Sequence, residues 1–447
     1  MPFKLKEILK LTPELEAWLQ EHKDRHPADV ADALESLNEL DMARVFIRLD
    51  GETAALVLRN LKTKSVNALL DALGPERIAA ILDEMSLDDA ADFLGEVSED
   101  VKDELLELME ADEASDVKEL LAYPEDSAGG IMTTEYVAIL ETITAGKAIE
   151  VLRETAPEAE TVYYVYVINT SNKLVGVISL RELIVADPQE QIGVIMQENV
   201  ISVPVTMDQE EVARVVTKYG LLAVPVVDQD GSLVGIVTVD DVIDVIHEEA
   251  TEDIFLLAGT SEVETELPLL GRLSMSVRSR LPWLLVTLLG GMIAGSVLRG
   301  LEDELNQMVA LAFFVPLLTG MGGNVGTQSS TLTVRGLAMG AIEGKEAWVT
   351  VVKECLSGLI IGAICGMIVG SVALVMYGNW ILGLVVGLAL VGNMVTAATV
   401  GTLVPLVFRR VGIDPAVASA PFISTSIDIT GLLIYSSLAS ALIAYLI

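Results

Sequence analysis

The amino-acid sequence predicts a multidomain membrane protein: an all-α helical-repeat domain at residues 1–127, a doubled α/β domain at 128–247, a connecting helix at 248–280 and an all-α five-helix membrane domain at 281–447. Three observations lead to this prediction. The charge changes along the chain, two internal repeats of different length occupy the first part, and five apolar stretches of membrane-spanning length follow them.

The two parts of the chain differ in charge. Residues 1–270 contain 19 Lys and Arg against 57 Asp and Glu, a net charge of −38, whereas residues 271–447 contain 9 against 8 and bring the whole chain to −37. An anionic surface of this size repels nucleic acid and attracts cations. We therefore expect no nucleic-acid partner. The acidic surface either binds cations or serves only to keep the domain soluble.

The first predicted domain contains a helical repeat. Four related segments open 24 residues apart, at His26, Asp50, Gly74 and Ser98, and a second set of helical patterns such as DMARVFIRL lies between them. Paired short helices at a fixed period stack so that each unit buries its apolar face against the next. No residue type here demands catalysis, so a scaffold or docking surface is expected.

The second predicted domain is doubled, with alternating strand and helix patterns. IMTTEYVAIL, YVYVIN and GVISLRELI in the first copy correspond to IMQENVISV, AVPVVD and GIVTVDDVI in the second, and Gly176 and Gly235 are 59 residues apart. This pattern resembles a tandem pair of CBS domains, which are β-α-β-β-α regulatory modules. The resemblance covers roughly residues 131–247 and implies that the two copies pair with each other.

The CBS resemblance also implies a nucleotide site. In that family a Ser/Thr-x-x-Asp sequence after the last strand often holds a nucleotide ribose. Thr238 to Asp241 matches this pattern in the second copy, whereas Ser179 to Glu182 in the first copy departs from it by one methylene. The resemblance thus implies that the second copy binds ATP or another adenine nucleotide. The alternative is an empty, purely structural module.

Five apolar stretches predict five membrane spans. They run from about Leu281 to Leu298, from Met308 to Gly323 and onward, from Leu356 to Tyr377, from Trp380 to Phe408 and from Pro421 to Ile447. Basic residues gather on alternate connections, namely Arg272, Arg278, Arg280, Arg335, Lys345, Lys353, Arg409 and Arg410. Positive charges favour the cytoplasmic side. The N-terminal domains are therefore predicted in the cytoplasm and the C-terminus outside, in a plasma (inner) membrane.

Asp428 is the only carboxylate inside these apolar stretches. An ionisable side chain in hydrocarbon costs at least ~2.5 kcal/mol, so it faces protein or water and is functional by default. Ser424 and Thr425 precede it by four and three residues and share its helix face. We therefore predict that these three side chains line an ion pathway.

Polar residues in two other spans are expected to face the same cavity. The second span carries TGMGGNVGTQSST, which predicts a glycine-rich break in the helix beside Asn324, and the fourth span carries Asn393. The third span has a glycine at every fourth position from Gly358 to Gly370, a ladder typical of close helix packing.

Neutral oxygens around one carboxylate suit a hard cation. One carboxylate per chain cannot balance a divalent charge, whereas a twofold homodimer supplies two. Mg²⁺ dehydrates reluctantly, so the predicted site holds the hydrated ion.

The order of the domains resembles the MgtE family of magnesium channels across essentially the whole chain. The most specific pieces are GMGGNVGTQS and RRVGIDPAVASAPFISTSIDITGLLIY. The resemblance implies that Mg²⁺ enters down its gradient through a homodimer in the lipid bilayer, with Asp428 as the ion-selective aspartate. It also implies that cytosolic Mg²⁺ binds between the acidic domains and closes the pore. The matching regulatory positions are Asp240, Asp241, Asp244, Glu252 and Asp253, with Asp88, Asp89 and Asp92 in the helical repeat and Asp414 before the fifth span.

Two other functions fit the sequence. One is a secondary transporter that couples Mg²⁺ to Na⁺ or H⁺ through the same residues. The other is a CBS-bearing membrane sensor without transport, which has no need of Asp428. An enzyme is not expected, because neither half contains a nucleophile and base pair or a phosphate-binding glycine loop.

Overall fold

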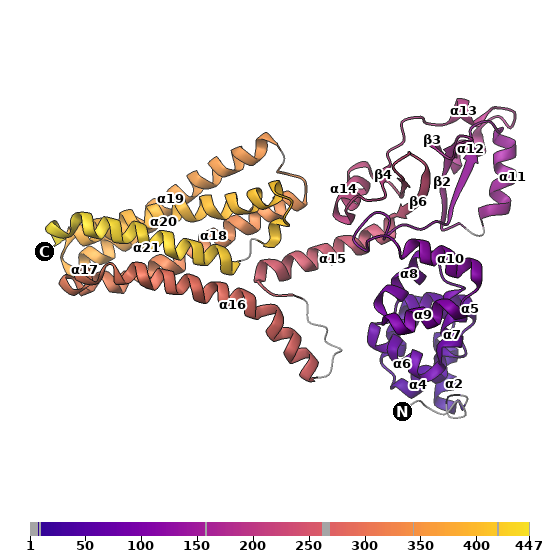
Figure 1. Ribbon diagram of the computed structural model, residues 1–447, viewed down its shortest axis with the longest axis horizontal. Helices are drawn as coiled ribbons and strands as arrows, with labels where there is room; N and C mark the ends of the chain where they lie inside the picture. Colours follow the sequence, from indigo (N-terminus) through magenta and orange to yellow (C-terminus); the bar gives the residue numbers. More distant parts are fainter. Residues whose placement is uncertain are drawn as a thin grey trace. The chain divides into compact units, whose positions relative to one another are not determined.

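A computed structural model describes residues 8, 10–156, 159–261, 269–342, 344–417 and 420–446 (Figure 1). The chain forms two compact units, residues 1–246 and 247–447. Their boundary lies inside helix α15 (Val239–Ala258). The predicted connecting segment 248–280 is divided between the end of α15 and the start of α16 (Leu269–Arg299), and residues 262–268 lie outside the described part.

The N-terminal part of the first unit is a stack of short helices. Their bounds are α2 (Pro13–His22), α3 (Pro27–Glu35), α4 (Glu39–Phe46), α5 (Gly51–Arg59), α6 (Thr63–Leu73), α7 (Pro75–Leu82), α8 (Leu87–Glu96), α9 (Glu99–Leu108) and α10 (Ala111–Leu120). Helices α3, α5, α7 and α9 begin 24 residues apart, as do α4, α6, α8 and α10. The predicted helical repeat is confirmed.

The residues that open the repeats are the N-caps of its helices. His26, Asp50, Gly74 and Ser98 precede α3, α5, α7 and α9. Asp50 shows why such residues start a helix, since its Oδ1 accepts a hydrogen bond of 3.0 Å from the Thr53 N–H, a donor with no partner inside the helix.

The remainder of the first unit is a pair of similar α/β modules. The first contains β1 (Tyr136–Leu140), α11 (Ala145–Thr155), β2 (Thr161–Ile168), β3 (Leu174–Ser179), α12 (Leu180–Val185) and α13 (Ile192–Ile195). The second contains β4 (Val203–Pro204), α14 (Gln209–Tyr219), β5 (Ala223–Val227), β6 (Leu233–Thr238) and the start of α15. In each sheet the first strand is parallel to the second, and the second is antiparallel to the third.

Three apolar clusters hold the first unit together. The second α/β module shares one continuous core with the helical repeat, while the first module has a core of its own. A third cluster joins the two modules through Tyr166, Ala223, Leu233 and Ile236. Because the second module and the helical repeat share a core, the first turn of α15 lies against the repeat.

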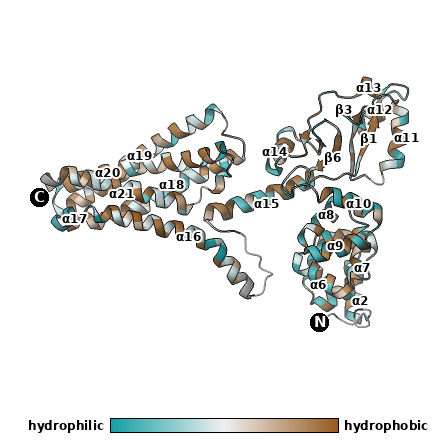
Figure 2. Cartoon of the chain, in the orientation of Figure 1, coloured by the Kyte–Doolittle hydropathy of each residue, from teal (hydrophilic) through white to brown (hydrophobic). Residues whose placement is uncertain are grey.

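The second unit is built from long apolar helices. After α16 come α17 (Glu302–Gln307), the 3₁₀ helix η2 (Val309–Phe314), α18 (Val315–Ala338), α19 (Lys345–Tyr377), α20 (Trp380–Arg410), the 3₁₀ helix η3 (Pro415–Val417) and α21 (Ala420–Leu446). Five of these segments are long and apolar enough to span a membrane. Figure 2 shows hydrophobic residues along all of them. The prediction of five membrane-spanning helices is confirmed.

The glycine-rich second span is a continuous helix, so the predicted break is wrong. Helix α18 runs without interruption through Gly322, Gly323 and Gly326. A Cβ at Gly326 would overlap Ile427 of α21, and one at Gly323 would lie 2.7 Å from the Ser424 Oγ. These glycines therefore let α20 and α21 approach α18 closely instead of unwinding it.

The predicted glycine ladder packs α19 on α20. A Cβ at Gly358, Gly362, Gly366 or Gly370 would lie 2.6–2.8 Å from backbone atoms of α20. Backbone cannot move aside as a flexible side chain can. Contact between these two helices thus depends on the absence of side chains along one face of α19.

Gly366→Ala should lower the thermal unfolding midpoint of the detergent-solubilised protein. The added Cβ would meet the Gly387 carbonyl oxygen at 2.6 Å, and overpacking of this kind typically costs ~1–3 kcal/mol. Gly291→Ala is the matched control, because a Cβ there meets nothing within 4 Å in the described chain. Equal midpoints for the two variants would refute the close contact.

Candidate ion sites

Asp428 lies in the third turn of α21, the helix that begins at Ala420. Its side chain is half-buried, and within the described part of the chain the carboxylate makes no hydrogen bond or ion pair. Ser424, one turn earlier, touches Gly323 of α18, and Thr425 packs its methyl on Gly290 of α16. The structure therefore brings the predicted trio together on α21, with its carboxylate unneutralised.

Helix α18 presents a polar stripe that the described part of the chain leaves uncovered. Gly320, Asn324, Gln328 and Thr331 are all exposed, and their spacing of four, four and three residues places them on one face. The opposite face carries the glycines that pack on α20 and α21. Asn324, predicted to face the ion pathway, thus points away from the packed core of its own chain.

Asn393 does not reach this exposed stripe. It is 0% exposed on α20, and its Nδ2 donates a hydrogen bond of 2.7 Å to the Leu318 carbonyl oxygen of α18. The structure therefore places it among helices, away from the predicted cavity surface.

Helix α19 carries two carboxylates, Glu346 and Glu354, that precede the predicted start of the third span. Helix α19 begins at Lys345, eleven residues before the predicted start of the span, so Glu354 lies inside the apolar helix. The Ser329 Oγ of α18 donates a hydrogen bond of 2.8 Å to Glu354 Oε2. Lys353 and Glu354 precede Leu356, where the continuous apolar stretch begins, so the sequence pattern places both in the connection before the span.

A cluster of charged side chains lies where the helical repeat meets the second CBS-like module. Arg59 ends α5 and forms a paired contact with Asp89 of α8, with Nε to Oδ1 at 3.0 Å and Nη1 to Oδ2 at 3.1 Å. Its Nη2 lies 4.0 Å from Asp240 Oδ2 and 3.9 Å from Asp241 Oδ1 in the first turn of α15. One guanidinium is therefore shared by three carboxylates.

A carboxylate triad adjoins this cluster. Oxygen atoms of Asp88, Glu135 and Glu160 lie within 4.8 Å of one another. Parallel pairing of β1 with β2 causes the convergence, since Glu135 and Glu160 immediately precede these strands and the Glu160 N–H bonds the Glu135 carbonyl oxygen at 2.8 Å. Among the described residues no Lys, Arg or His forms an ion pair with the triad. Three hard oxygen donors without a counter-ion suit Mg²⁺.

Sequence reasoning identified Asp88 but neither glutamate of the triad. The available signal was an acidic residue directly before each of two strands that pair in parallel. Parallel pairing brings their N-terminal ends side by side, but this pairing could not be read from the sequence alone.

Burial, and after it the crowding of negative charge, raises the pKa values of carboxyl groups in this cluster. Burial, followed by the charge of Asp88, raises the pKa of Asp241 from 3.8 to about 8. Burial also raises the pKa of Asp89 to about 6, although the Arg59 charge opposes the shift. Burial raises the pKa of Glu135 as well. Separate, hydrated domains would relieve these penalties, so the contact favours a bound proton or cation.

The other predicted regulatory positions lie apart from this cluster. Asp92 and Asp244 are exposed in the first unit, while Glu252 is exposed and Asp253 half-buried on the later turns of α15. Asp414 is exposed, and its Oδ1 accepts a hydrogen bond of 2.8 Å from the Ala416 N–H at the start of η3. Of the predicted positions, Asp88, Asp89, Asp240 and Asp241 are the ones that converge.

The two predicted nucleotide motifs are both engaged internally. The Thr238 hydroxyl hydrogen-bonds with Asp240 and Asp241. In the first copy the Ser179 hydroxyl donates to Glu182 Oε2 at 2.7 Å, and the two residues form a capping box at the start of α12. A ribose would have to compete with these contacts.

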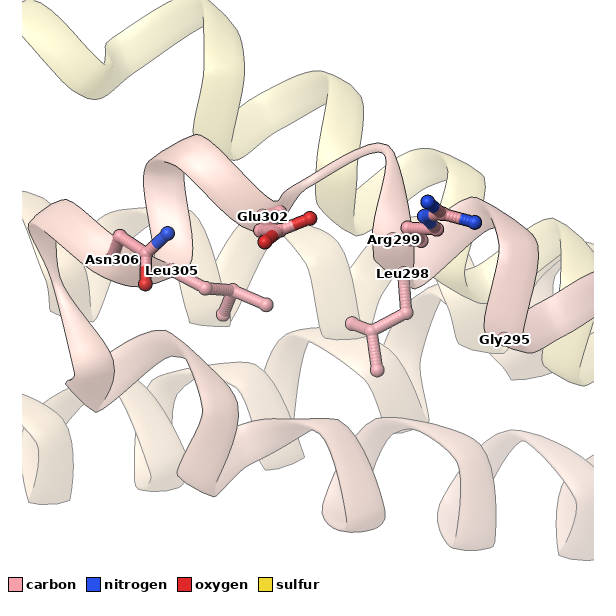
Figure 3. A pocket seen from close by; sticks show the side chains of 6 residues that line it. All are labelled: Gly295, Leu298, Arg299, Glu302, Leu305 and Asn306. Carbon is pink, nitrogen blue, oxygen red and sulfur yellow. The ribbon is translucent and has the colours of Figure 1, made fainter.

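An open depression lies where α16 meets α17 (Figure 3). Its lining residues are Gly295, Leu298, Arg299, Glu302, Leu305 and Asn306. No predicted site residue is among them, and the depression carries one cationic and one anionic side chain.

The fold and the sites together define a multi-pass membrane protein with an acidic water-soluble part whose oxygen ligands suit divalent cations. Three family models match the chain: an MgtE intracellular N domain at residues 25–126, CBS domains at 128–188 and 191–248, and a divalent cation transporter domain, MgtE, at 315–438.

Curated relatives agree with these matches. A magnesium transporter MgtE from Thermus thermophilus is 44% identical over 325 residues, which is 72% of each chain. One of the same name from Enterococcus faecalis is 45% identical over 331 residues, covering 74% of this chain and 72% of the relative. A crystal structure of the cytosolic domain of the Mg²⁺ channel MgtE in complex with ATP is 42% identical, with a TM-score of 0.50, and covers 52% of this chain and 94% of that one. The chain belongs to the MgtE family.

Proposed function

We propose that this protein imports Mg²⁺ across the plasma membrane as a homodimer, and that cytosolic Mg²⁺ bound to its acidic domains closes the pathway. The observation that carries the proposal is the exposed polar stripe of α18, together with an unneutralised Asp428 on α21, the helix that packs on the glycine face of α18. Lipid cannot satisfy Asn324, Gln328 and Thr331, so this face requires water or protein.

A second copy of the chain meets this requirement. A twofold axis along the stripe would place two Asp428 side chains around one pathway and match the charge of a divalent ion. The uncharged oxygens of Asn324, Ser424 and Thr425 would then hold water of the hydrated ion. In this arrangement Mg²⁺ is the transported substrate, and no catalytic role is proposed for any residue.

The helix ends support one orientation in the membrane. Arg409 at the end of α20 donates to the Leu337 carbonyl oxygen near the end of α18 at 3.1 Å, so these two basic ends lie on the same side. At the other side, the Ser440 hydroxyl of α21 bonds Glu304 of the acidic α17. By the positive-inside rule the first side is cytoplasmic, and the C-terminus is outside.

The carboxylates between the helical repeat and the CBS pair support the gating proposal. The triad of Asp88, Glu135 and Glu160 offers carboxylate oxygens close enough together to hold Mg²⁺. The ion would add positive charge to a cluster of carboxylates that Arg59 neutralises only in part. Asp244, Glu252, Asp253, Asp92 and Asp414 are proposed as further, weaker Mg²⁺ positions. The segment 247–280 would carry the change to the membrane helices.

Mg²⁺ flux into proteoliposomes tests the proposed function. Purified wild-type protein should pass Mg²⁺ down its gradient without any imposed sodium or proton gradient. Flux that requires either gradient would identify a coupled transporter, and absence of divalent flux would leave a membrane sensor. A panel of Co²⁺, Ni²⁺ and Mn²⁺ establishes the selectivity in the same assay.

Adenine-nucleotide binding is a further part of the proposal, because the cytosolic domain of a relative was crystallised with ATP. We expect Asp241→Ala to abolish calorimetric binding of ATP to the purified protein and Glu182→Ala to leave it intact. The physical reason is the length of the side chain. Asp241, three residues after Thr238, is one methylene shorter than Glu182 and has the length to meet a ribose hydroxyl. The reverse result would assign the nucleotide to the first CBS copy.

A further inference from the structure

Asn393 is a fully buried amide between the two helices that carry the proposed ion ligands. It is 0% exposed, its Nδ2 donates to the Leu318 carbonyl oxygen at 2.7 Å, and its Oδ1 has no hydrogen-bond partner among the described residues. A buried acceptor without a donor costs free energy, so packing of the surrounding helices must hold the amide in place.

Two glycines make room for this amide. A Cβ at Gly322 of α18 would lie well under 3.0 Å from Asn393 Nδ2, and one at Gly431 of α21 would lie 2.5 Å from Asn393 Oδ1. Gly322 is two residues from Asn324, and Gly431 is three residues from Asp428. The amide therefore contacts both helices within one turn of the proposed ligands.

We infer that Asn393 is a positioning residue for Mg²⁺ permeation, which sets the spacing between α18 and α21 without touching the ion. The hydrogen bond fixes the position of α18 along α20, and the contact at Gly431 fixes how closely α21 approaches. The inference rests on the proposed role of Asp428 in the ion pathway.

If Asn393 positions α18 and α21, removing its amide should rescue some glycine variants and not others. Gly322→Ala and Gly431→Ala should each reduce Mg²⁺ flux about tenfold or more, because displacements near 1 Å are costly at a preorganised site. Adding Asn393→Ala should restore flux at least several-fold in the Gly431→Ala background, where the three nearest atoms to the added Cβ all belong to Asn393. The rescue of Gly322→Ala should be smaller, because the added Cβ there also lies 2.9 Å from the Ile427 Cγ2. Gly326→Ala is the matched control. Its Cβ would overlap Ile427 and not Asn393, so Asn393→Ala should not rescue it.

The single variants test positioning apart from folding. Asn393→Ala should remain folded in size-exclusion chromatography, yet raise the half-saturating Mg²⁺ concentration and weaken discrimination against the larger Ca²⁺. Asn393→Ser, which leaves a smaller void, serves if the alanine variant does not fold. Unchanged flux and selectivity in a folded Asn393 variant, or equal rescue of Gly326→Ala, would overturn the inference. If Asp428→Ala also transports normally, the proposed function fails instead.

Discussion

Replacing Asp428 with alanine should abolish Mg²⁺ flux while the protein stays folded. The carboxylate has no neutralising partner in the described part of its own chain, so its removal relieves a burial cost and leaves the packing of α21 intact. Asp428→Asn should be nearly as damaging. At about 4 Å and an effective dielectric constant near 20, one charge pair contributes on the order of 4 kcal/mol, roughly a thousandfold in ion occupancy.

Glu354→Gln provides the matched control for this experiment. It also removes a carboxylate from an apolar helix, but Glu354 bonds Ser329 at the contact between α18 and α19, away from the exposed stripe. We expect its flux to stay close to that of the wild type. Wild-type flux through purified, folded Asp428→Ala would contradict the assignment of the ion site, whatever the Glu354 variant does.

Cytosolic Mg²⁺ should protect the full-length protein from proteolysis between the helical repeat and the CBS pair. Residues 1–270 carry a net charge of −38, and the contact between these domains concentrates carboxylates around a single Arg59. Mg²⁺ bound at the triad would offset this repulsion. Several weak sites together can supply the roughly 5 kcal/mol of differential binding free energy that shifts the domains almost completely from the separated to the associated form. NaCl at equal ionic strength is the control. Protection no greater than with NaCl would end the gating proposal.

The same contact should respond to pH when Mg²⁺ is absent. The pKa of Asp241 is about 8 and that of Asp89 about 6 in the associated domains, both above the ordinary value of 3.8. When the helical repeat and the CBS pair are in contact, they bind more protons than they would when separated. The contact therefore becomes more stable as pH falls from about 8 toward 4, and this stabilisation is lost as pH rises through 8. Cleavage should therefore be faster at pH 8.5 than at pH 6.5, and added Mg²⁺ should reduce the difference.

Asp241→Asn imitates the protonated side chain. It should slow cleavage at pH 8.5 without Mg²⁺ and flatten the pH dependence. Asp230→Asn removes the same charge from an exposed turn of the same CBS module and should leave cleavage unchanged. Identical behaviour of the two variants would show that net charge, and not the cluster at Arg59, governs association.

The architecture could be predicted from the sequence because its signals are local. A 24-residue helical period, a doubled strand and helix pattern and five long apolar stretches each lie within a short window of residues. Asp428 could be identified in the same way, since a charge within an apolar stretch stands out whatever the tertiary arrangement.

Contacts between distant segments decided the rest. The glycines of α18 read as a break, but the helix stays continuous because α20 and α21 pack into the space that they leave. Asn393 is buried because Leu318, Gly322 and Gly431 surround it from two other helices. Glu135 and Glu160 join Asp88 through the parallel pairing of β1 and β2 and through the start of α8, where the Leu87 N–H donates a hydrogen bond of 3.0 Å to Glu135 Oε2. Burial and charge proximity depend on which residues meet in space, and residue order alone does not specify this.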